Sequence, residues 1–257
     1  MNLRQVKKAT LPVLEALGMK GAAIAVKSRY DQFKNRYVHN NNDIFYTLSP
    51  NILPAIAMSF EILEADSPAL LETGAYYEFG VFKGFSTWFA EAVSRNKTAS
   101  AFRFYGFDSF EGLPDTSVDR NPWWLPGNYA ASYESVMSSI KSHGGDVERI
   151  ILVKGFYSAD LFEGFRRTHS IRPPAIVVID SDIYESANLV LDFFGEYFLP
   201  GTILLFDDYN VFDKSDAHGE RRALKDFESK NPSFAKRHLF DFGWHGAAYV
   251  VAHGITP

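Results

Sequence analysis

Four aspartates occupy two short motifs, each of which follows an apolar run. Asp180 and Asp182 follow residues 175–179, and Asp207 and Asp208 follow residues 202–206. Clustered carboxylates are costly unless a cation lies between them or some of them stay protonated. Their oxygens suit Mg²⁺, Mn²⁺ or Ca²⁺, and the chain has no cysteine that would favour a softer metal. The motifs therefore predict a divalent-metal site. The alternative is that some of these acids only cap helices.

A second motif joins an acid to two glycines. Glu78 precedes Gly80 and Gly84, and Ser86 stands where a helix is expected to begin. Glycine lets a backbone approach a ligand closely, and the acid suits a ligand with a positive group such as an ammonium. The spacing G-x-x-x-G differs from the G-x-G-x-x-G of dinucleotide sites, which disfavours a pyrophosphate. The alternative is a tight strand-to-helix turn without a ligand.

Asp108 ends the apolar run at 102–107, at about the distance beyond Gly84 that nucleoside sites show. A carboxylate in that position can accept hydrogen bonds from both ribose hydroxyls. Together with the glycine motif, Asp108 predicts a nucleoside ligand. The alternative is that Asp108 only caps a loop.

These residues depend on elements that alternate along the chain from residue 74. The predicted strands are 76–79, 102–107, 150–153, 175–179 and 202–206, and the predicted helices are 86–95, 130–143, 158–168 and 184–197. This alternation is typical of a doubly wound parallel sheet with crossover helices. Two further strands, 235–240 and 247–252, have no helix between them and predict an antiparallel hairpin at one sheet edge. Ligands of such sheets bind beyond the carboxyl ends of the strands, where the strand order reverses.

The chain is predicted to divide into an N-terminal helical extension, residues 1–73, and one α/β domain, residues 74–257. Apolar residues recur at helical spacing from Pro50 to Ala65. Residues 1–37 contain eight Lys or Arg against two acidic residues. A solvated helix on an acidic neighbour is the expected interpretation of this basic arm. A membrane surface or a partner, including a second copy of the chain, is the alternative.

Composition limits the class of protein. The net charge of -5 and the 46% of hydrophobic residues are typical of a soluble globular protein. No apolar run approaches the roughly 18 residues that span a bilayer, and no signal peptide is evident. We therefore expect a cytoplasmic protein without membrane insertion. The mild acidity argues against broad nucleic-acid binding.

Taken in order, the motifs resemble the macrocin O-methyltransferase family. The matching runs are 77–84, 106–114, 179–186 and 207–209, and Gly219, Arg221, Ala223 and Phe227 keep the helix pattern of that family. The resemblance extends from about residue 74 to residue 230. It implies a class I methyltransferase that uses S-adenosylmethionine, with a seven-stranded sheet whose last strand is antiparallel. Family members methylate hydroxyls of small molecules, notably antibiotic sugars, with bound Mg²⁺.

The resemblance also implies residue roles. The implied cofactor-binding residues are Glu78, Gly80, Gly84, Ser86, Asp108, Ser109 and Asp180. The implied ligands of Mg²⁺ or Mn²⁺ are Asp180, Asp207 and Asp208, with Asp182 as the fallback ligand. The candidates for proton transfer are Asp180, Asp182 and His218. Three departures concern the acceptor side. Ser181 replaces a family glycine, the loop before Gly219 is longer and more charged, and Trp123-Trp124 is unusual.

Other interpretations remain open. Asp180-Ser181-Asp182 is also a D-x-D, which in a glycosyltransferase would hold a metal and a nucleotide diphosphate. A non-catalytic binding protein on the same fold is the other alternative. Phe156-Tyr157 follows the third strand, where a planar base could stack or where the rings simply belong to the core.

Overall fold

Strands and helices alternate along the computed structural model, which describes residues 52–115 and 124–255. The strands are β1 (Ala75–Phe79), β2 (Arg103–Asp108), β3 (Ile150–Lys154), β4 (Pro174–Ile179), β5 (Ile203–Phe206), β6 (Ala235–Phe242) and β7 (Gly246–His253). The helices are α3 (Leu53–Asp66), α4 (Pro68–Thr73), α5 (Phe85–Ser94), α6 (Tyr133–Ser142), α7 (Ala159–Thr168), α8 (Tyr184–Phe194) and α9 (Gly219–Lys230), with a 3-10 turn η3 (Gly195–Tyr197) after α8.

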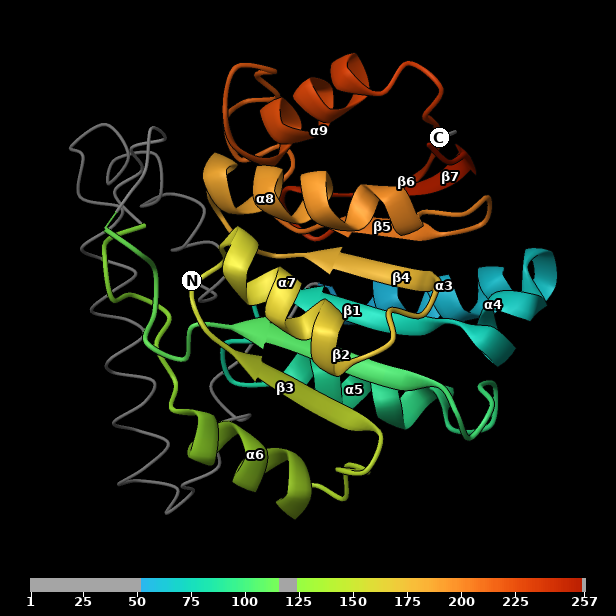
Figure 1. The fold of residues 1–257 in the computed structure, drawn as a ribbon, viewed down its shortest axis with the longest axis vertical. Coiled ribbons are helices and arrows are strands. Elements are labelled where there is room, and N and C mark those ends of the chain that lie inside the picture. Colours follow the sequence, from blue (N-terminus) through green and yellow to red (C-terminus); the bar gives the residue numbers. More distant parts are fainter. Residues whose placement is uncertain (1–51, 116–123, 256–257) are drawn as a thin grey trace, which may run out of the picture. The chain divides into compact units, whose positions relative to one another are not determined.

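The seven strands form one sheet in the order β3-β2-β1-β4-β5-β7-β6 (Figure 1). β1 pairs in parallel with both β2 and β4, and β5 continues the parallel part beside β4. β7 is antiparallel to β5 and forms the antiparallel hairpin with β6. The predicted seven-stranded, doubly wound sheet and its terminal hairpin are therefore confirmed. The strand order reverses between β1 and β4, so the switch point lies at their carboxyl ends.

Helices cover both faces of the sheet. In Figure 1, α7 and α8 lie on the viewer's side, whereas α3 and α5 lie behind. Successive strand residues point to opposite faces. Accordingly, the Phe79 ring packs at 5.1 Å from Phe194 of α8, whereas Tyr76 packs on Phe104 at 5.7 Å on the other face. Aromatic residues make up much of the core on both sides, and this buried area is the main stabilising contribution of the sheet.

Capping residues explain where two helices begin. Ser132 accepts a hydrogen bond from the backbone N–H of Ser135, and Ser158 accepts one from Leu161. Helix α6 therefore begins at Tyr133, later than the predicted start at residue 130. Helix α7 begins at Ala159, within one residue of its prediction.

Helices α3 and α4 lie inside the predicted N-terminal extension. Phe60 of α3 is fully buried and packs edge-on against Phe102, 6.4 Å away. These helices thus contribute to the core behind the sheet. Residues 1–51 lie outside the described residues, and the division at residue 73 stays a prediction.

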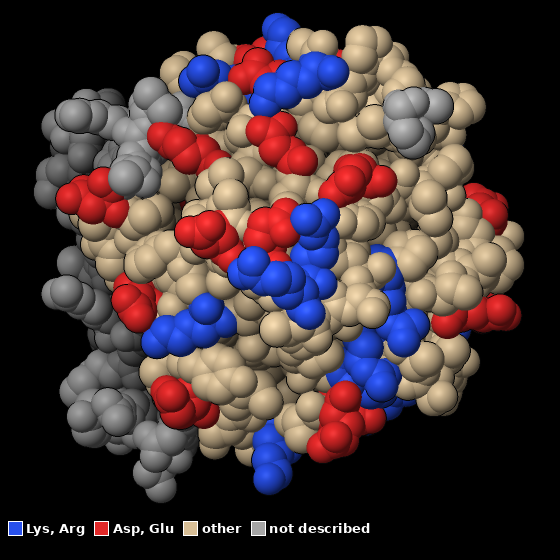
Figure 2. All heavy atoms as spheres, in the orientation of Figure 1, with Lys and Arg blue, Asp and Glu red and all other residues tan. Residues whose placement is uncertain are grey.

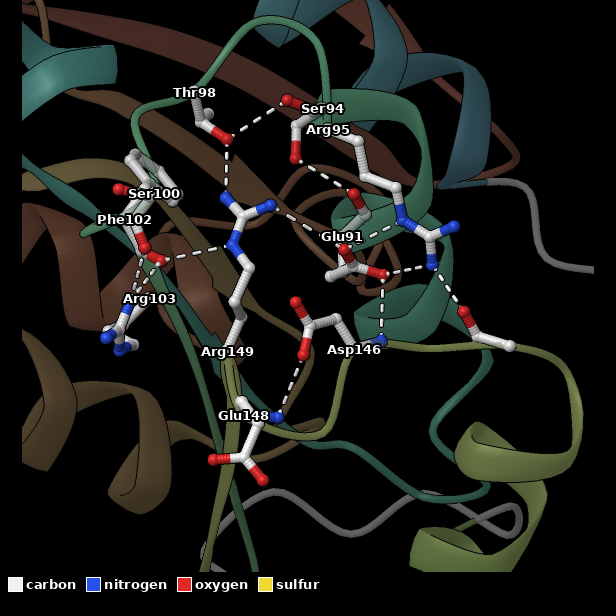
Figure 3. A network of polar contacts seen from close by, with 11 residues as sticks. Glu91, Ser94, Arg95, Thr98, Ser100, Phe102, Arg103, Asp146, Glu148 and Arg149 are labelled. Atoms are coloured by element: carbon white, nitrogen blue, oxygen red, sulfur yellow. Dashed lines mark hydrogen bonds and ion pairs between the residues drawn. The ribbon is translucent and has the colours of Figure 1, made fainter.

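A buried acid joins elements at the amino end of the sheet. Glu91 of α5 has no exposed side-chain area and accepts two hydrogen bonds from Arg95, at 2.9 and 2.6 Å (Figure 3). Arg149, directly before β3, lies 3.7 Å from the same carboxylate and donates to the Thr98 hydroxyl. The backbone N–H of Asp146 donates to Glu91 as well. This network ties the end of α5 to the segment that enters β3.

Acidic and basic side chains are mixed over the face that carries α7 and α8 (Figure 2). Arg166 pairs with Glu163 at 2.7 Å, and Lys230 of α9 pairs with Asp192 of α8 at 2.9 Å. These charges compensate one another locally. Among the described helices, none is both long and apolar enough to cross a membrane.

Candidate active site

The glycine turn after β1 lies directly against the end of β4. Gly80 has a φ of +101°, and a Cβ built there would lie 1.7 Å from the backbone oxygen of Asp180. The backbone N–H of Asp180 donates to the carbonyl of Phe79 at 2.8 Å. A side chain at position 80 would therefore push the two strand ends apart. The glycine motif and the first acidic motif meet at the switch point of the sheet.

Gly84 has a different environment. Its φ is +80°, and a Cβ there would lie 2.6 Å from Val136 and 3.1 Å from Ile140. The space that glycine leaves is thus filled by side chains of α6. This packing accounts for the glycine without a ligand, so its predicted contact with the cofactor stays a prediction.

Glu78 is fully buried beneath this turn. It accepts hydrogen bonds from the hydroxyls of Tyr76 at 2.8 Å, Thr87 at 2.7 Å and Ser86. Burial raises the pKa of Glu78 to about 7, and the three hydroxyls oppose that rise. The carboxyl group holds the first turn of α5 against β1. A contact of Glu78 or Ser86 with a ligand ammonium stays a prediction.

Asp108 binds the backbone of the same turn. Its Oδ2 accepts from the N–H groups of Val81 and Phe82 at 2.9 and 2.8 Å, and its Oδ1 accepts from Phe110 at 2.6 Å. Burial raises its pKa, and these N–H groups act in the opposite direction. The carboxylate therefore fixes the glycine turn from β2. It is only partly buried, and its predicted bond to ribose stays a prediction.

Ser109 shapes the loop after β2. Its hydroxyl donates to the carbonyl of Gly112 at 2.8 Å and accepts from the N–H of Glu111 at 3.0 Å. Leu113 then exchanges backbone hydrogen bonds with Gly127 and Asn128. The loop thus returns toward the strand ends before α6. The predicted role of Ser109 at the cofactor is not tested by these contacts.

Three of the four strand-end aspartates converge. One carboxylate oxygen each from Asp180, Asp182 and Asp208 lies within 4.8 Å of the others, and Asp207 is outside this group. The structure therefore groups Asp182, the fallback ligand of the prediction, with Asp180 and Asp208 in the place of Asp207. Burial and then the charge of Asp208 raise the pKa of Asp207 to about 7. Asp182 has a φ of +62°, a conformation unusual for a residue with a side chain.

The carboxylates of Asp182 and Asp208 lie close enough to repel each other when both are ionised. Burial, followed by the neighbouring carboxylate of Asp208, raises the pKa of Asp182. Burial and the charges of Asp207 and Asp208 raise that of Asp180. The cluster thus needs positive charge, supplied by protons or by a cation. Its oxygen-only donor set fits Mg²⁺ or Mn²⁺.

Two residues beside the Asp180, Asp182 and Asp208 cluster were not predicted from the sequence. Glu220, in the first turn of α9, is 1% exposed and accepts from the backbone N–H of Asp208 at 3.1 Å. The Tyr129 ring lies 5.7 Å from Phe82. Burial raises the pKa of Tyr129, and the charges of Asp182, Asp208 and Asp180 add to it. For Glu220, the signal was an acid directly after the glycine that begins a helix; for Tyr129, the sequence offered none.

Aromatic rings and histidines surround the loop after β5. His218 is exposed, and its ring packs 5.1 Å from Phe212, which packs 5.3 Å from Trp124. Trp123 lies outside the described residues. His245 lies in the turn between β6 and β7, and its backbone carbonyl accepts from the N–H of Asn210 at 2.8 Å. The predicted catalytic role of His218 stays a prediction.

The two aromatic residues after β3 differ. Tyr157 donates to the carbonyl of Phe107 at 2.9 Å and packs edge-on against Phe79. Phe156 is 46% exposed. Of the two interpretations of this pair, core packing applies to Tyr157, and the stacking of a base on Phe156 stays untested.

Comparisons with known proteins identify a family and a curated relative. A family model described as macrocin-O-methyltransferase (TylF) matches residues 70–248. The 8-demethyl-8-(2,3-dimethoxy-alpha-L-rhamnosyl)-tetracenomycin-C 4'-O-methyltransferase of Streptomyces olivaceus is 28% identical over 145 residues, covering 54% of each chain. The chain therefore spans about half the length of this curated relative.

Solved structures share the fold. The O-methyltransferase NovP superposes with a TM-score of 0.61 and 19% identity, over 77% of this chain and 78% of that one. The calicheamicin methyltransferase CalS11 gives a TM-score of 0.56 and 20% identity over 77% of each chain. The family match covers more than half of the sequence and includes every motif at the carboxyl ends of β1, β2, β4 and β5. On this evidence, the chain belongs to the macrocin O-methyltransferase family.

Proposed function

We propose that this chain transfers a methyl group from S-adenosylmethionine to a hydroxyl of a small molecule, a sugar or another polyhydroxylated natural product, with the help of a divalent cation. The observation that carries the proposal is the family match over residues 70–248. The geometry supports it, because the glycine turn and the aspartates of β4 and β5 lie at one edge of the sheet.

The chain's part in methyl transfer is mainly positioning. S-adenosylmethionine brings a methyl group already activated on a sulfonium, so that the reaction forms a carbon–oxygen bond and breaks a carbon–sulfur bond. The protein must hold donor and acceptor in line and exclude water. The turn from Gly80 to Gly84 would approach the methionine part, and Asp108 would accept from the ribose. Asp108 already fixes the backbone of that turn, and Glu78 holds the start of α5 directly after it through the hydroxyls of Ser86 and Thr87.

Asp180, Asp182 and Asp208 would hold the cation. A divalent cation in this position would lower the pKa of an acceptor hydroxyl and stabilise the resulting anion. The convergence of three carboxylate oxygens and their raised pKa values support this assignment. Asp207 would lie beside the cation site and contribute its negative charge there.

The hydroxyl proton needs a base. Asp180, Asp182 and His218 are the candidates. A cation lowers the pKa of a carboxylate that binds it, so a carboxylate would act as the base only through an oxygen that the cation does not bind.

A sugar is the acceptor class that two observations favour. The printed name of the Streptomyces olivaceus relative describes methylation of a rhamnosyl group. In this chain, the rings of Tyr129, Trp124 and Phe212 lie in the loops around the strand ends. Aromatic faces suit the apolar faces of sugar rings, while the aspartates suit their hydroxyls.

The test is a methyl-transfer assay with the purified full chain, labelled S-adenosylmethionine and Mg²⁺. Glycosides with neighbouring hydroxyls form one arm and catechols the other. Label on a glycoside, lost with a chelator, is the expected result. Turnover that persists with the chelator would contradict the proposed requirement for a divalent cation.

Calorimetry with S-adenosylhomocysteine and with UDP separates methyl transfer from the D-x-D alternative, because a glycosyltransferase would bind only UDP. Cofactor binding without label on either class of acceptor would favour a non-catalytic protein.

A further inference from the structure

Glu220 is a fifth carboxylate at the strand-end site. It follows Gly219 at the start of α9, and its side chain is buried. Its Oε2 accepts from the backbone N–H of Asp208. The residue therefore reaches the end of β5 from a different element, and its bond holds the backbone of a proposed cation ligand.

The second oxygen of Glu220 has no such partner. Oε1 is buried and receives no hydrogen bond. The hydroxyl of Ser181, between Asp180 and Asp182, is also buried and has no hydrogen-bond partner. Buried polar atoms without partners are rare in native proteins, and they often mark a place where an ion or a water molecule binds. A buried carboxylate is costly unless positive charge or a proton compensates it.

The neighbouring arginines do not provide that charge. Arg221 donates to Asp216 and Asn210, and Arg222 lies over the ring of Tyr184. Within residues 52–115 and 124–255, no lysine or arginine forms an ion pair with Glu220. Because the side chain is buried and hydrogen-bonded to the backbone of Asp208, an ionised Glu220 would add its negative charge to the region that holds the aspartates.

We propose that Glu220 is a positioning residue that raises the affinity of the Asp180, Asp182 and Asp208 site for a divalent cation. It does so by fixing the backbone of Asp208 and by adding one buried negative charge. The inference rests on the cation of the proposed function. It goes further in assigning to α9 a part in cation binding that is independent of cofactor and acceptor.

The test is calorimetry of Mg²⁺ and, separately, Mn²⁺ with the metal-free full chain, in the absence of cofactor and acceptor. Glu220→Gln keeps an oxygen for the Asp208 N–H but removes the charge, and we expect it to weaken cation binding by about 10-fold or more. Glu220→Asp keeps the charge and should retain more affinity than Glu220→Gln. Glu228→Gln is the matched control, since Glu228 lies on the same helix but pairs with Lys236 at the surface.

Thermal unfolding without cation separates this role from a merely structural one. Removal of an uncompensated buried charge should leave the midpoint of Glu220→Gln equal to or above that of the parent chain, while its cation affinity falls. A structural role predicts a lower midpoint with unchanged cation affinity, and that result would overturn the proposal.

Asp208→Asn separates the inference about Glu220 from the proposed cation site itself. If it abolishes cation binding while Glu220→Gln binds as the parent chain does, the inference about Glu220 fails and the proposed cation site stands. If the parent chain itself binds neither cation, both the inference and the metal part of the proposed function are wrong. Binding of S-adenosylhomocysteine without metal should be the same in all variants.

Discussion

The carboxyl group of Glu78 is buried and bound by three hydroxyls, and its pKa is raised from 4.5 to about 7. Because the folded state binds this proton more tightly than the unfolded chain does, the resulting stabilisation is complete below pH 4.5. It is lost as the pH rises through 7, by at most about 3 kcal/mol. Glu78→Gln stays neutral throughout. Urea unfolding should therefore show the variant gaining stability relative to the parent chain between pH 4.5 and pH 8.

The exposed Glu134 in α6 serves as the control, because Glu134→Gln should leave this pH profile unchanged. A difference between Glu78→Gln and the parent chain that is constant with pH would mean that the pKa of Glu78 is the same in the folded and the unfolded chain.

Asp108 is expected to affect both the stability of the chain and its binding of the cofactor. Its two oxygens accept three backbone N–H groups of the turn after β1 and the loop after β2. Asp108→Ala leaves these donors without a partner and should lower the free energy of unfolding by about 2 kcal/mol or more. Since the glycine turn is expected to bind the cofactor, calorimetry should also show weaker binding of S-adenosylhomocysteine. Unchanged affinity would mean that the turn keeps its shape without Asp108 and that Asp108 does not touch the ribose.

At the scale of elements, the close approach of β1 to the end of β4 depends on one glycine. Gly80→Ala places a Cβ 1.7 Å from a backbone oxygen that cannot rotate away. The variant should be destabilised by about 3 kcal/mol or more, and the site at the strand ends should lose its geometry. Gly127 is the matched control: it also has a positive φ, +78°, but a Cβ there meets nothing within 4 Å. Gly127→Ala should cost only about 1 kcal/mol. Equal losses in chemical denaturation of the two variants would show that backbone strain, and not the contact with β4, is decisive.

The strands were predictable because each buried strand is a short apolar run between turn signals. The predicted strand 175–179 corresponds to β4, Pro174–Ile179, and the hairpin followed from the lack of a helix between β6 and β7. The carboxyl ends of parallel strands meet at one edge, so the gathering of acids there also followed. Which acids converge did not follow, because Asp207 and Asp208 come after the last residue of β5, where the alternation of a strand no longer sets the direction of a side chain. Asp208 joins Asp180 and Asp182, whereas Asp207 is outside the group.

Contacts between elements that are far apart in the sequence could not be predicted from it. Glu220 meets Asp208 only because α9 begins beside the end of β5, and Gly84 owes its space to side chains of α6. The spacing of residues in the sequence identifies a glycine or an acid but does not say which neighbour fills the space around it. The glycine motif was correctly located, whereas its ligand contacts stay a prediction.

At the scale of the whole molecule, the two ends of the sheet carry different kinds of charge cluster. At the carboxyl end, aspartates and Glu220 lie together and require positive charge from outside the cluster. At the amino end, Glu91 is already compensated by Arg95 and Arg149, and Asp146 adds a backbone hydrogen bond (Figure 3). The first arrangement is suited to binding an ion, and the second to holding elements together.

This division predicts that stability and ligand binding can be changed separately. Glu91→Ala removes the compensation of Arg149, whose side chain is only 12% exposed, and should lower the free energy of unfolding by about 3 kcal/mol. Asp192→Ala breaks the surface pair with Lys230 and should cost much less. At a temperature where Glu91→Ala is fully folded, its calorimetric affinities for S-adenosylhomocysteine and for Mg²⁺ should equal those of the parent chain. The ligand site lies at the opposite end of the strands, and the sheet between them is filled by rigidly packed aromatic rings. A loss of either affinity in the folded variant would mean that the network at the amino end also sets the geometry of the site.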